Sequence, residues 1–371
     1  MKEKKIVNYG LAEGILRFVR IWSGGKPARI IRLWKRYRIV AKGNKVRQQY
    51  LTEKNLVIPP LVISSVTMQC NLECAGCYSR EYPEDGELTL EELESLFQQA
   101  EALGVAFFVI TGGEPLKREG LLPLMQSYPN LIFLMFTNGT YVDPVVAETI
   151  GRTDNILPIL SVEGTKESTD RRRGEGCYDQ ILRAMEYLRQ ADVFFGFSAV
   201  LTRDNFDILS DAAFYDDMIK RGCRIGFCLG YVPSARDADM ALILTPEEHA
   251  GFRNRFLKFQ REKRILLVHL PDDEYRETGS CMAAGRGFIH VNAQGYVEPC
   301  PFSHFASDTI RKTSLKEALK TTFFKHIRDH ANLLTQPRLG CALFEHQDEL
   351  EKAAERLGAR WTENLEKKES S

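Results

Sequence analysis

The sequence predicts an α/β fold in which parallel strands alternate with helices. Six short apolar runs are candidate strands, and the helical segments between them give the alternation that is typical of βα units and a parallel sheet. One helix has a recognisable start, because Thr89 and Glu92 form a capping-box pattern that predicts a helix to about Leu103. Residues 348–366, which are rich in Glu, Lys, Ala and Leu, predict a terminal helix. The candidate strands span residues 61–67, 105–111, 131–137, 156–162, 193–201 and 224–230.

The composition predicts a folded protein of the cytoplasm. The chain has 371 residues, of which 44% are hydrophobic and 27% charged, so it is long enough to bury a large core and is not a disordered chain. Its nine cysteines include clusters at metal-ligand spacing, which fits a reducing compartment better than a disulfide framework. No apolar run approaches the roughly 18 residues of a membrane span, and the first residues lack the apolar region of a signal peptide.

The formal net charge is zero, but the charge is unevenly distributed. Residues 1–48 carry fourteen lysines and arginines against two glutamates, so the rest of the chain is acidic. Basic residues that flank an apolar and aromatic stripe are typical of a helix lying in a membrane interface. For a protein of the cytoplasm, this would be the inner face of the membrane. Two other interpretations are a helical lid that packs its stripe on the barrel, and a site for an acidic peptide or nucleotide; we expect no nucleic-acid partner. The stripes are Leu11, Ile15, Phe18, Val19 and Trp22, then Ile30, Ile31, Trp34 and Tyr37.

Three cysteines with the spacing C-x3-C-x2-C follow the first candidate strand. They are Cys70, Cys74 and Cys77. A [4Fe–4S] cube normally takes four thiolates, so three leave one iron open, and an open position is what separates a reactive metal site from a structural one. Zinc sites usually have a second C-x2-C pair, and none is nearby. The pattern therefore predicts a reactive iron–sulfur cluster, and a disulfide or a chance grouping is the alternative.

This spacing at the end of a hydrophobic strand resembles the radical SAM superfamily. In that family three cysteines bind the cube, and the open iron binds S-adenosylmethionine, whose reductive cleavage gives a 5′-deoxyadenosyl radical. The resemblance implies that Cys70, Cys74 and Cys77 bind the cluster and that Tyr78 lies near the adenine. It also implies a partial (βα)6 TIM-like barrel over residues 56–265, after a basic amphipathic helical extension over residues 1–55. Active sites of parallel barrels lie at the carboxyl ends of the strands.

Further motifs fall at the ends of later candidate strands. Residues 112–115 resemble the GGEP motif of the family, so Gly112, Gly113, Glu114 and Pro115 are expected to contact S-adenosylmethionine, with Glu114 accepting a bond from its ammonium group. Glycines allow a close approach of the backbone to a ligand. The motif directly follows a candidate strand, which makes the resemblance more specific than four residues alone would be.

The third and fourth candidate strands end in two more motifs. Asn138, in a Thr-Asn-Gly run, resembles a cofactor-binding element of the family, although Asn-Gly is also a common turn. Ser161, Glu163 and Arg173 resemble an S-x-D-G…R-G pattern, with Glu163 where Asp is usual. Ser161 is expected to contact the ribose or the methionine carboxylate, and Arg173 the carboxylate. A surface position for Arg173 is the alternative, because two arginines precede it.

A second set of cysteines lies in residues 266–371. Cys281 and Cys300 belong to a run, C-x3-G…G-x4-C-P-F, that resembles the opening of a SPASM or twitch domain, and Cys341 follows later. The resemblance implies a small α+β domain with an auxiliary [4Fe–4S] cluster on these three cysteines, brought together by a hairpin turned near residue 294. The fourth ligand is left open between His304, Glu345, His346 and none. Unligated core cysteines are the alternative.

Together these motifs predict a radical SAM enzyme, an oxidoreductase or transferase. It would abstract hydrogen from a peptide or membrane-associated substrate, assisted by the auxiliary cluster. The resemblance implies S-adenosylmethionine and two [4Fe–4S] clusters as cofactors, and an electron donor such as flavodoxin or ferredoxin. A non-catalytic carrier or sensor of iron–sulfur clusters is the alternative, but it leaves residues 112–115 and 137–139 unexplained.

Overall fold

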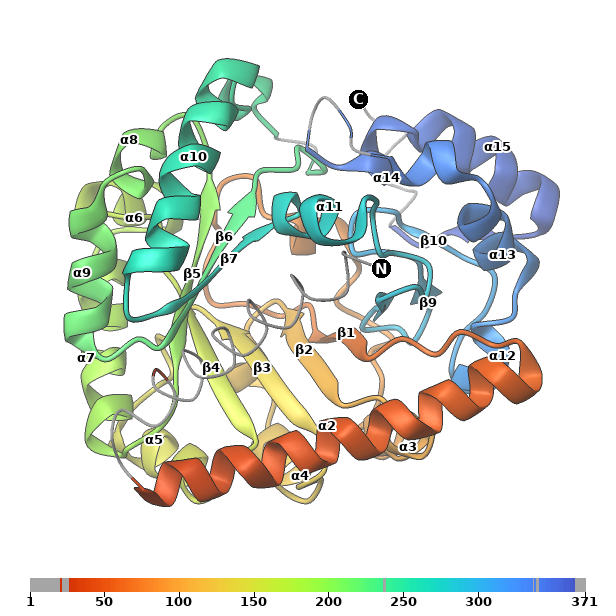
Figure 1. The fold of residues 1–371 in the computed structure, drawn as a ribbon, viewed down its shortest axis with the longest axis horizontal. Helices are drawn as coiled ribbons and strands as arrows, with labels where there is room; N and C mark the ends of the chain where they lie inside the picture. The colour runs from red at the N-terminus through yellow and green to blue at the C-terminus, as the bar shows by residue number, and fades with distance from the viewer. Residues whose placement is uncertain (1–20, 22–26, 236–237, 336, 338–339, 364–371) are drawn as a thin grey trace, which may run out of the picture.

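A computed structural model describes residues 21, 27–235, 238–335, 337 and 340–363. Its main feature is one nine-stranded sheet with the strand order β7-β6-β5-β4-β3-β2-β1-β8-β9, curved into a partial barrel with helices on its outer side (Figure 1). Strands β1 to β7 are parallel to their neighbours, and so is β8 to β1. The α/β class and the partial barrel that the sequence predicts are confirmed.

The strands are short, as is usual for a barrel. A second sheet of two strands, β10 and β11, lies in the C-terminal part. The bounds are β1 Leu61–Thr67, β2 Phe107–Gly112, β3 Ile132–Thr137, β4 Ile156–Ser161, β5 Gly196–Leu201, β6 Ile225–Gly230, β7 Leu266–Leu270, β8 Phe288–Val291, β9 Val297–Glu298, β10 Phe305–Ala306 and β11 Arg360–Trp361.

The helices of the barrel follow its strands, and shorter helices form the C-terminal part. The α-helices are α2 Pro27–Lys54, α3 Leu90–Ala102, α4 Leu121–Gln126, α5 Pro144–Gly151, α6 Lys166–Arg173, α7 Cys177–Gln190, α8 Phe206–Leu209, α9 Ala212–Arg221, α10 Pro246–Glu262, α11 Asp272–Thr278, α12 Leu315–Ala318, α13 Thr322–Asp329, α14 Ala342–Glu345 and α15 Gln347–Leu357. Four 3-10 helices are η1 Tyr78–Glu81, η2 Pro115–Lys117, η3 Met240–Leu242 and η4 Ala331–Leu334.

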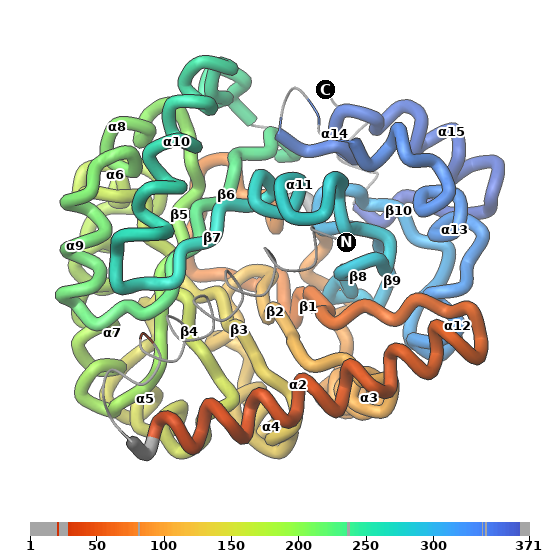
Figure 2. The backbone as a smooth tube through the Cα atoms, viewed as in Figure 1, coloured from red at the N-terminus to blue at the C-terminus, as the bar shows by residue number. Residues whose placement is uncertain are grey.

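The six candidate strands are all present, and a seventh parallel strand, β7, extends the expected six-unit barrel. β7 pairs with β6 from Ile225↔Leu266 to Leu229↔Leu270. β7 has only five residues and follows the long helix α10, so its apolar pattern did not clearly indicate a strand. The expected domain boundary at residue 265 therefore lies immediately before a strand of the same sheet. The sheet also continues into the C-terminal part through β8, which lies beside β1 (Figure 2).

The start of α3 and the end of α15 are both determined by the residues at the helix ends. The capping box of Thr89 and Glu92 is present at the start of α3, with both reciprocal hydrogen bonds. The expected terminal helix over residues 348–366 ends earlier than predicted. Gly358 takes a left-handed conformation (φ 73°) directly after α15, and the chain then forms β11. Pairing of β11 with β10 is a tertiary contact, which composition alone does not indicate.

The core lies between the sheet and the outer helices. On one side, Phe97 of α3 packs edge-on against Phe108 of β2 and in a tilted arrangement against Phe133 of β3, with ring centroids 4.9 and 5.1 Å apart. All three rings are fully buried, which makes this aromatic group a strong contribution to the stability of the barrel. Such packing fixes the strands and thereby the loops at their carboxyl ends.

The long helix α2 crosses the amino ends of the barrel strands (Figure 1). Arg36 donates to the carbonyl of Pro129 at 2.5 Å, before β3, and pairs with Asp154, before β4. Arg47 donates to the carbonyl of Gly104 at 2.5 Å, before β2. These contacts lie at the opposite end of the barrel from the loops that carry the cysteine motif. Part of the basic charge of the N-terminal segment therefore anchors the helix.

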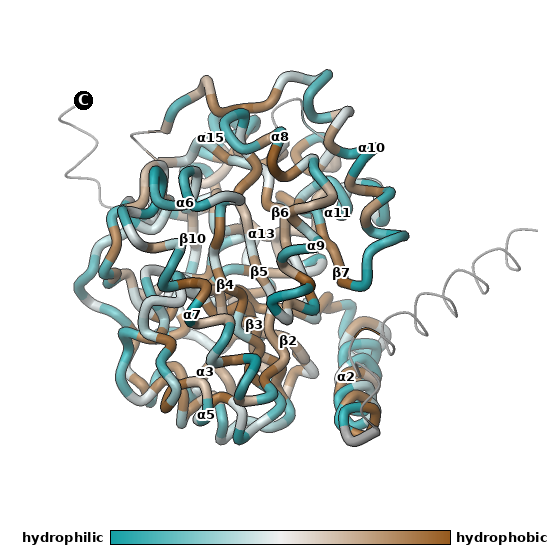
Figure 3. The backbone as a smooth tube through the Cα atoms, turned by 90° about the vertical axis from the view of Figure 1, so that its left-hand side faces the viewer, coloured by the Kyte–Doolittle hydropathy of each residue, from teal (hydrophilic) through white to brown (hydrophobic). Residues whose placement is uncertain are grey.

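The outward face of α2 is apolar and aromatic. Ile31, Trp34 and Tyr37 are 71%, 60% and 67% exposed, and Ile30 is 46% exposed. Figure 3 looks nearly along this helix and shows both hydrophobic and hydrophilic residues on it, to one side of the barrel. The expectation of a lid that packs this stripe on the barrel is therefore wrong for residues 30–37, because Leu33 and the anchoring arginines face the barrel instead. The first stripe, residues 11–22, lies outside the described residues.

A search for helices capable of crossing a bilayer gives a negative result. Within the described ranges, no helix is both long enough and apolar enough to do so.

Candidate active site at the carboxyl ends of the strands

The main cavity lies at the carboxyl ends of β1 to β6 and has a volume of about 770 Å³. This is within the range of about 300–1,000 Å³ that is typical of small-molecule sites. Each of these strands contributes residues from its carboxyl end or from the segment that follows it, as expected for a parallel barrel. The predicted site residues on the wall are Cys70, Cys74, Cys77, Tyr78, Gly112, Gly113, Asn138, Ser161 and Arg173.

The three cysteines of the first motif lie in the loop between β1 and η1. Cys74 is buried, whereas Cys70 and Cys77 are half-buried. Cys70 Sγ accepts a hydrogen bond from Leu72 N at 3.4 Å and from Asn138 Nδ2 at 3.8 Å. Burial raises the pKa of the Cys70 and Cys74 thiols, while Arg173 acts to lower that of Cys74. Three thiols on one wall of a cavity fit a cluster, since each binds metal as the thiolate.

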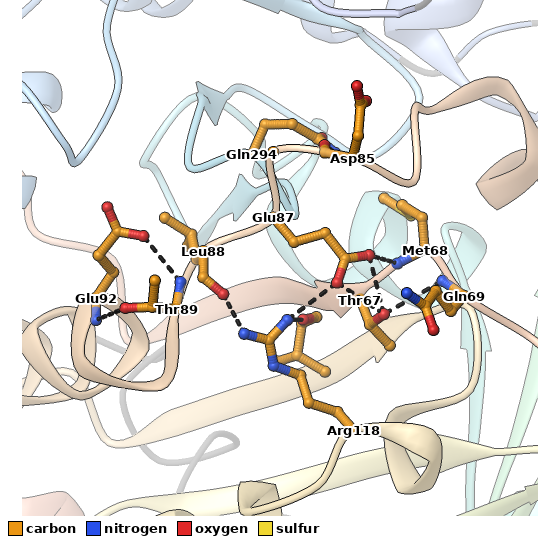
Figure 4. A network of polar contacts seen from close by, with 12 residues as sticks. Thr67, Met68, Gln69, Asp85, Glu87, Leu88, Thr89, Glu92, Arg118 and Gln294 are labelled. Atoms are coloured by element: carbon orange, nitrogen blue, oxygen red, sulfur yellow. Dashed lines mark hydrogen bonds and ion pairs between the residues drawn. The ribbon is translucent and has the colours of Figure 1, made fainter.

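A carboxylate and an arginine fix the point where this loop leaves β1 (Figure 4). Glu87 accepts hydrogen bonds from Thr67 Oγ1 at 2.9 Å and from Met68 N at 2.6 Å. Arg118, which follows η2, pairs with Glu87 at 3.0 Å and donates to the carbonyls of Val66 and Leu88. The network thus joins the end of β1, the start of α3 and the residues after the Gly-Gly motif. Sequence analysis missed it, because neither residue belongs to a motif.

Two backbone segments approach closely at Gly112 and Gly113, so neither position has room for a side chain. A Cβ atom added at Gly112 would lie 2.1 Å from the carbonyl oxygen of Thr67, and one at Gly113 would lie 2.2 Å from that of Gln69. In their place Gly113 N donates to Thr67 O at 2.7 Å, and Glu114 N donates to Gln69 O at 2.9 Å. These bonds lock the Gly-Gly loop beside the beginning of the cysteine loop.

Glu114 is fully buried behind this loop. Its carboxylate accepts from Leu116 N at 3.0 Å, Thr137 Oγ1 at 2.7 Å and Asn138 N at 2.7 Å. Burial raises its pKa, and these hydrogen bonds act in the opposite direction. Glu114 therefore joins the carboxyl ends of β2 and β3 and sets the backbone of Asn138. Its expected contact with a ligand ammonium stays a prediction.

Glu163 carries a second buried carboxylate, at the end of β4. It accepts from Arg172 Nη1 at 2.5 Å, from Arg173 Nη2 at 2.5 Å and from Val200 N at 3.1 Å. Burial acts to raise the pKa of Glu163, but the charges of Arg172 and Arg173 outweigh it and lower the pKa. The pair holds Arg173 at the cavity wall, so the surface position considered for this residue does not occur.

Helix α6 also contacts the cysteine loop directly. Ala75, between Cys74 and Cys77, donates its N–H to the carbonyl of Arg172 at 3.2 Å, and Arg172 Nε donates back to the carbonyl of Ala75 at 3.3 Å. The Glu163 carboxylate thus connects, through Arg172, to the middle of the cluster motif.

Cys177 is buried at the start of α7, where burial raises the pKa of its thiol to about 11.

The C-terminal part contributes one wall of the cavity. Phe302, two residues after Cys300, lines it and contacts Tyr78 edge-on with ring centroids 5.8 Å apart. Tyr78 Oη lies 3.1 Å from Thr111 Oγ1, and burial raises its pKa to about 12. The hydroxyl is therefore neutral at physiological pH, and Tyr78 lines the cavity beside Phe302.

Behind Tyr78 lies a buried polar network that sequence analysis did not predict. Glu298 of β9 is fully buried and accepts from Tyr82 Oη at 3.0 Å and from Thr362 Oγ1 at 2.5 Å. His290 Nδ1 lies 2.6 Å from Glu298 Oε2, and its Nε2 lies 2.8 Å from Ser65 Oγ of β1. A buried charge must be compensated by hydrogen bonds, so the network ties the barrel to the C-terminal part.

The second set of cysteines converges in the C-terminal part. Cys281, Cys300 and Cys341 are each less than a tenth exposed, and the charges of Cys341 and Cys281 rank after burial among the causes that raise the pKa of the Cys300 thiol. The hairpin of β8 and β9 is present as predicted, with Gly295 (φ 85°) in its turn. It brings Cys300 back toward Cys281, and Ala284 N donates to the carbonyl of Pro299 at 3.1 Å.

Neither set forms a site for a single ion. No three His, Cys, Asp or Glu side chains in the described part of the chain are placed to hold one metal ion. The ligands of a multi-iron cluster bind different irons, so they need not meet at one point. Both sets therefore fit a cluster by their donor chemistry and by their shared location.

The structure gathers most of the predicted site residues but not all of them on the cavity surface. Among the described residues that line the cavity, Glu114, Pro115 and Glu163 are absent; they lie directly behind it. Their predicted contacts with S-adenosylmethionine stay predictions, as do the ligand roles of the cysteines. What the geometry does show is that all the motifs of β1 to β4 meet at one cavity.

In enzymes with parallel barrels the active site lies at the carboxyl ends of the strands, which is where this cavity lies. The sequence profile of the radical SAM superfamily matches residues 64–214. The mycofactocin maturase MftC of Mycobacterium ulcerans is 32% identical over 267 residues, which cover 68% of this chain and 70% of the relative. The AdoMet-dependent heme synthase of Oleidesulfovibrio alaskensis is 27% identical over 303 residues, covering 72% and 76%.

The chain belongs to the radical SAM superfamily and is an enzyme, as the sequence predicts. The family implies a [4Fe–4S] cluster and S-adenosylmethionine. Two solved structures share the fold: SuiB of Streptococcus suis bound to the precursor peptide SuiA (TM-score 0.65, 15% identity, 80% of this chain and 72% of that chain) and anSMEcpe with bound AdoMet (TM-score 0.56, 20% identity, 80% and 97%).

We predict that Glu163→Gln destabilises the protein by about 3–5 kcal/mol, because two arginines lose the buried charge that compensates them. Since the pKa of Glu163 is lowered in the folded state, its stabilisation is present at neutral pH and is lost as the pH falls through that pKa. The difference between wild type and variant should therefore shrink in acid. Urea unfolding of the cluster-free protein across this pH range measures it.

Glu167→Gln is the matched control. Glu167 pairs with Arg171 on the same helix, but its side chain is 84% exposed, so its loss should change stability by less than about 0.5 kcal/mol. Equal stability of Glu163→Gln and wild type at neutral pH would contradict the account.

Proposed function

We propose that this enzyme reductively cleaves S-adenosylmethionine and abstracts a hydrogen atom from a peptide substrate, with the help of an auxiliary cluster. When bound at Cys70, Cys74 and Cys77, a reduced [4Fe–4S] cluster supplies the electron that yields a 5′-deoxyadenosyl radical. A flavodoxin or ferredoxin is the proposed electron donor. The proposal divides the chain into the N-terminal extension (1–55), the barrel (56–265) and the auxiliary domain (266–371).

The observation that carries the proposal is the convergence of the motifs on one cavity. The three cysteines line this cavity together with Gly112, Gly113, Asn138, Ser161 and Arg173. In the proposed complex Arg173 orients the methionine carboxylate, and Asn138 and Ser161 bind polar groups of the cofactor. Tyr78 provides an apolar surface for the adenine. The protein thereby positions the cofactor and excludes water.

Cys281, Cys300 and Cys341 are the proposed ligands of an auxiliary [4Fe–4S] cluster. These three thiols are buried and share one location, and burial raises the pKa of each. Metal binding would account for three such thiols lying together, because it releases their protons and compensates the negative charge of the thiolates. A cluster there would supply an electron acceptor or a ligand for the substrate.

A peptide is the proposed substrate class. MftC is named a maturase, and SuiB is seen with its precursor peptide, which supports the proposal. A second recess of about 320 Å³ shares Gly230 and Tyr231 with the main cavity and extends to Tyr275 and Gly340, next to Cys341. A side chain of a peptide bound there would lie between the two sets of cysteines.

The exposed face of α2 is a second candidate contact. Its aromatic and aliphatic residues lie among arginines and lysines, and Arg38 stacks over Trp34 at 4.9 Å. Such a face favours an anionic membrane surface. Because α2 crosses the amino ends of the strands, membrane contact would turn the cavity away from the bilayer. The contact would therefore anchor the enzyme, and it supports a peptide substrate over a lipid.

The proposed activity is tested by anaerobic reconstitution. We expect about eight irons per chain, and 5′-deoxyadenosine formation under dithionite. With Cys70, Cys74 and Cys77 changed to Ala, the iron should fall to about four and nucleoside formation should be lost. With Cys281, Cys300 and Cys341 changed to Ala, the iron should fall to about four, while nucleoside formation continues.

Two outcomes would contradict the proposal. Nucleoside formation that survives loss of the first three cysteines would exclude them as ligands of the reactive cluster. Iron that stays unchanged on loss of the second three would exclude an auxiliary cluster there.

The membrane contact is tested by flotation with anionic liposomes. We expect the full chain to float, and the paired variant Trp34→Glu/Tyr37→Glu to float at least tenfold less, because two exposed aromatic anchors are lost. Val145→Glu is the control, since Val145 is an exposed apolar residue (69%) elsewhere on the barrel. Equal flotation of the paired variant and the control, or no binding by the full chain, would contradict it.

A further inference from the structure

The proposed auxiliary cluster has three cysteines, which leaves one iron without a protein ligand. We propose that the carboxylate of Glu274 is its fourth ligand. This inference rests on the auxiliary cluster proposed above and adds a residue that belongs to no motif. Carboxylates bind iron in other protein sites. With one protein ligand at every iron, the cluster would serve as the electron acceptor considered above and not as a ligand for the substrate.

Glu274 lies on α11, which directly follows β7, and this helix holds two of the three cysteine loops. The Glu274 carboxylate accepts a hydrogen bond from Met282 N, the residue that directly follows Cys281, and the Cys281 thiol acts to lower the pKa of Glu274. The next residue, Tyr275, accepts from Ala342 N at 3.1 Å, directly beside Cys341. The carboxylate is thus fixed where the loops of Cys281 and Cys341 meet.

The charge of Glu274 reaches all three thiols. Burial is the main cause that raises the pKa of Cys281, Cys300 and Cys341, and the negative charge of Glu274 adds to it at each one. Burial also raises the pKa of Glu274, more than the nearby Arg286 lowers it. Glu274 is half-buried beside three buried thiols, and iron bound to all four groups would compensate their negative charges.

His304, Glu345 and His346 are the other candidates for the fourth ligand that the sequence left open, and the two histidines have other partners. His304 has Nδ1 2.6 Å from Tyr82 Oη and Nε2 3.1 Å from Glu363. His346 has Nδ1 3.3 Å from Glu349, with its side chain 29% exposed. Glu274 and Glu345 both act to raise the pKa of Cys341, Glu274 the more strongly. Glu274 also accepts a hydrogen bond from the backbone of the residue that follows Cys281.

The test uses the full chain with Cys70, Cys74 and Cys77 changed to Ala, so that only the auxiliary cluster binds. After reconstitution, iron content, Mössbauer spectra and electron paramagnetic resonance are measured before and after mild oxidation. We expect about four irons in this parent and in its Glu345→Gln control. Glu274→Gln should lose one of the four on oxidation and gain the signal of a three-iron cluster. Glu274→Cys should keep all four, with a uniform thiolate spectrum.

The outcomes separate the two proposals. A parent that binds no iron overturns both the auxiliary cluster and its ligand. A parent that binds about four irons, with Glu274→Gln indistinguishable from it, overturns only the assignment of Glu274. If Glu274→Gln does not fold, Glu274→Cys decides: a Mössbauer spectrum identical to that of the parent overturns the assignment, and a spectrum changed at one iron supports it.

Discussion

The buried charge of Glu163 is the constraint on which the arrangement of the site depends. A carboxylate at the end of β4 must be compensated, and Arg172 and Arg173 do so from the last turn of α6. Arg173 is thereby held at the cavity wall, and Arg172 is held against Ala75 in the cysteine loop. One ion-pair group thus positions both a proposed cofactor ligand and the loop that carries the proposed cluster.

Carboxylates also hold the ends of the neighbouring strands by hydrogen bonds, and one of them joins the barrel to the C-terminal part. Glu87 fixes the end of β1, and Glu114 joins the ends of β2 and β3. Glu298 then connects β1 to the hairpin of β8 and β9 through His290, and the pairing of β8 with β1 makes the hairpin part of the barrel sheet. Because hydrogen bonds and a shared sheet fix both sets of cysteines, their relative positions do not depend on a flexible linker.

The sequence predicted the features that depend on local order along the chain. Cysteine spacing, strand runs and the capping box of α3 all appear as expected, because each is specified by residues close in sequence. The exposed face of α2, the strand β7 and the role of Glu87 could not be predicted in this way. Each depends on a partner in another part of the chain: Arg36 reaches Asp154, and Glu87 pairs with Arg118.

The central claim is that two separate clusters are held within one sheet-based framework. Anomalous diffraction at the iron absorption edge, from anaerobic crystals of the reconstituted protein, tests it most directly. The account predicts two iron peaks, one beside Cys70, Cys74 and Cys77, and one beside Cys281, Cys300 and Cys341. A map with iron at only one of these places, or with iron bound elsewhere, would contradict it.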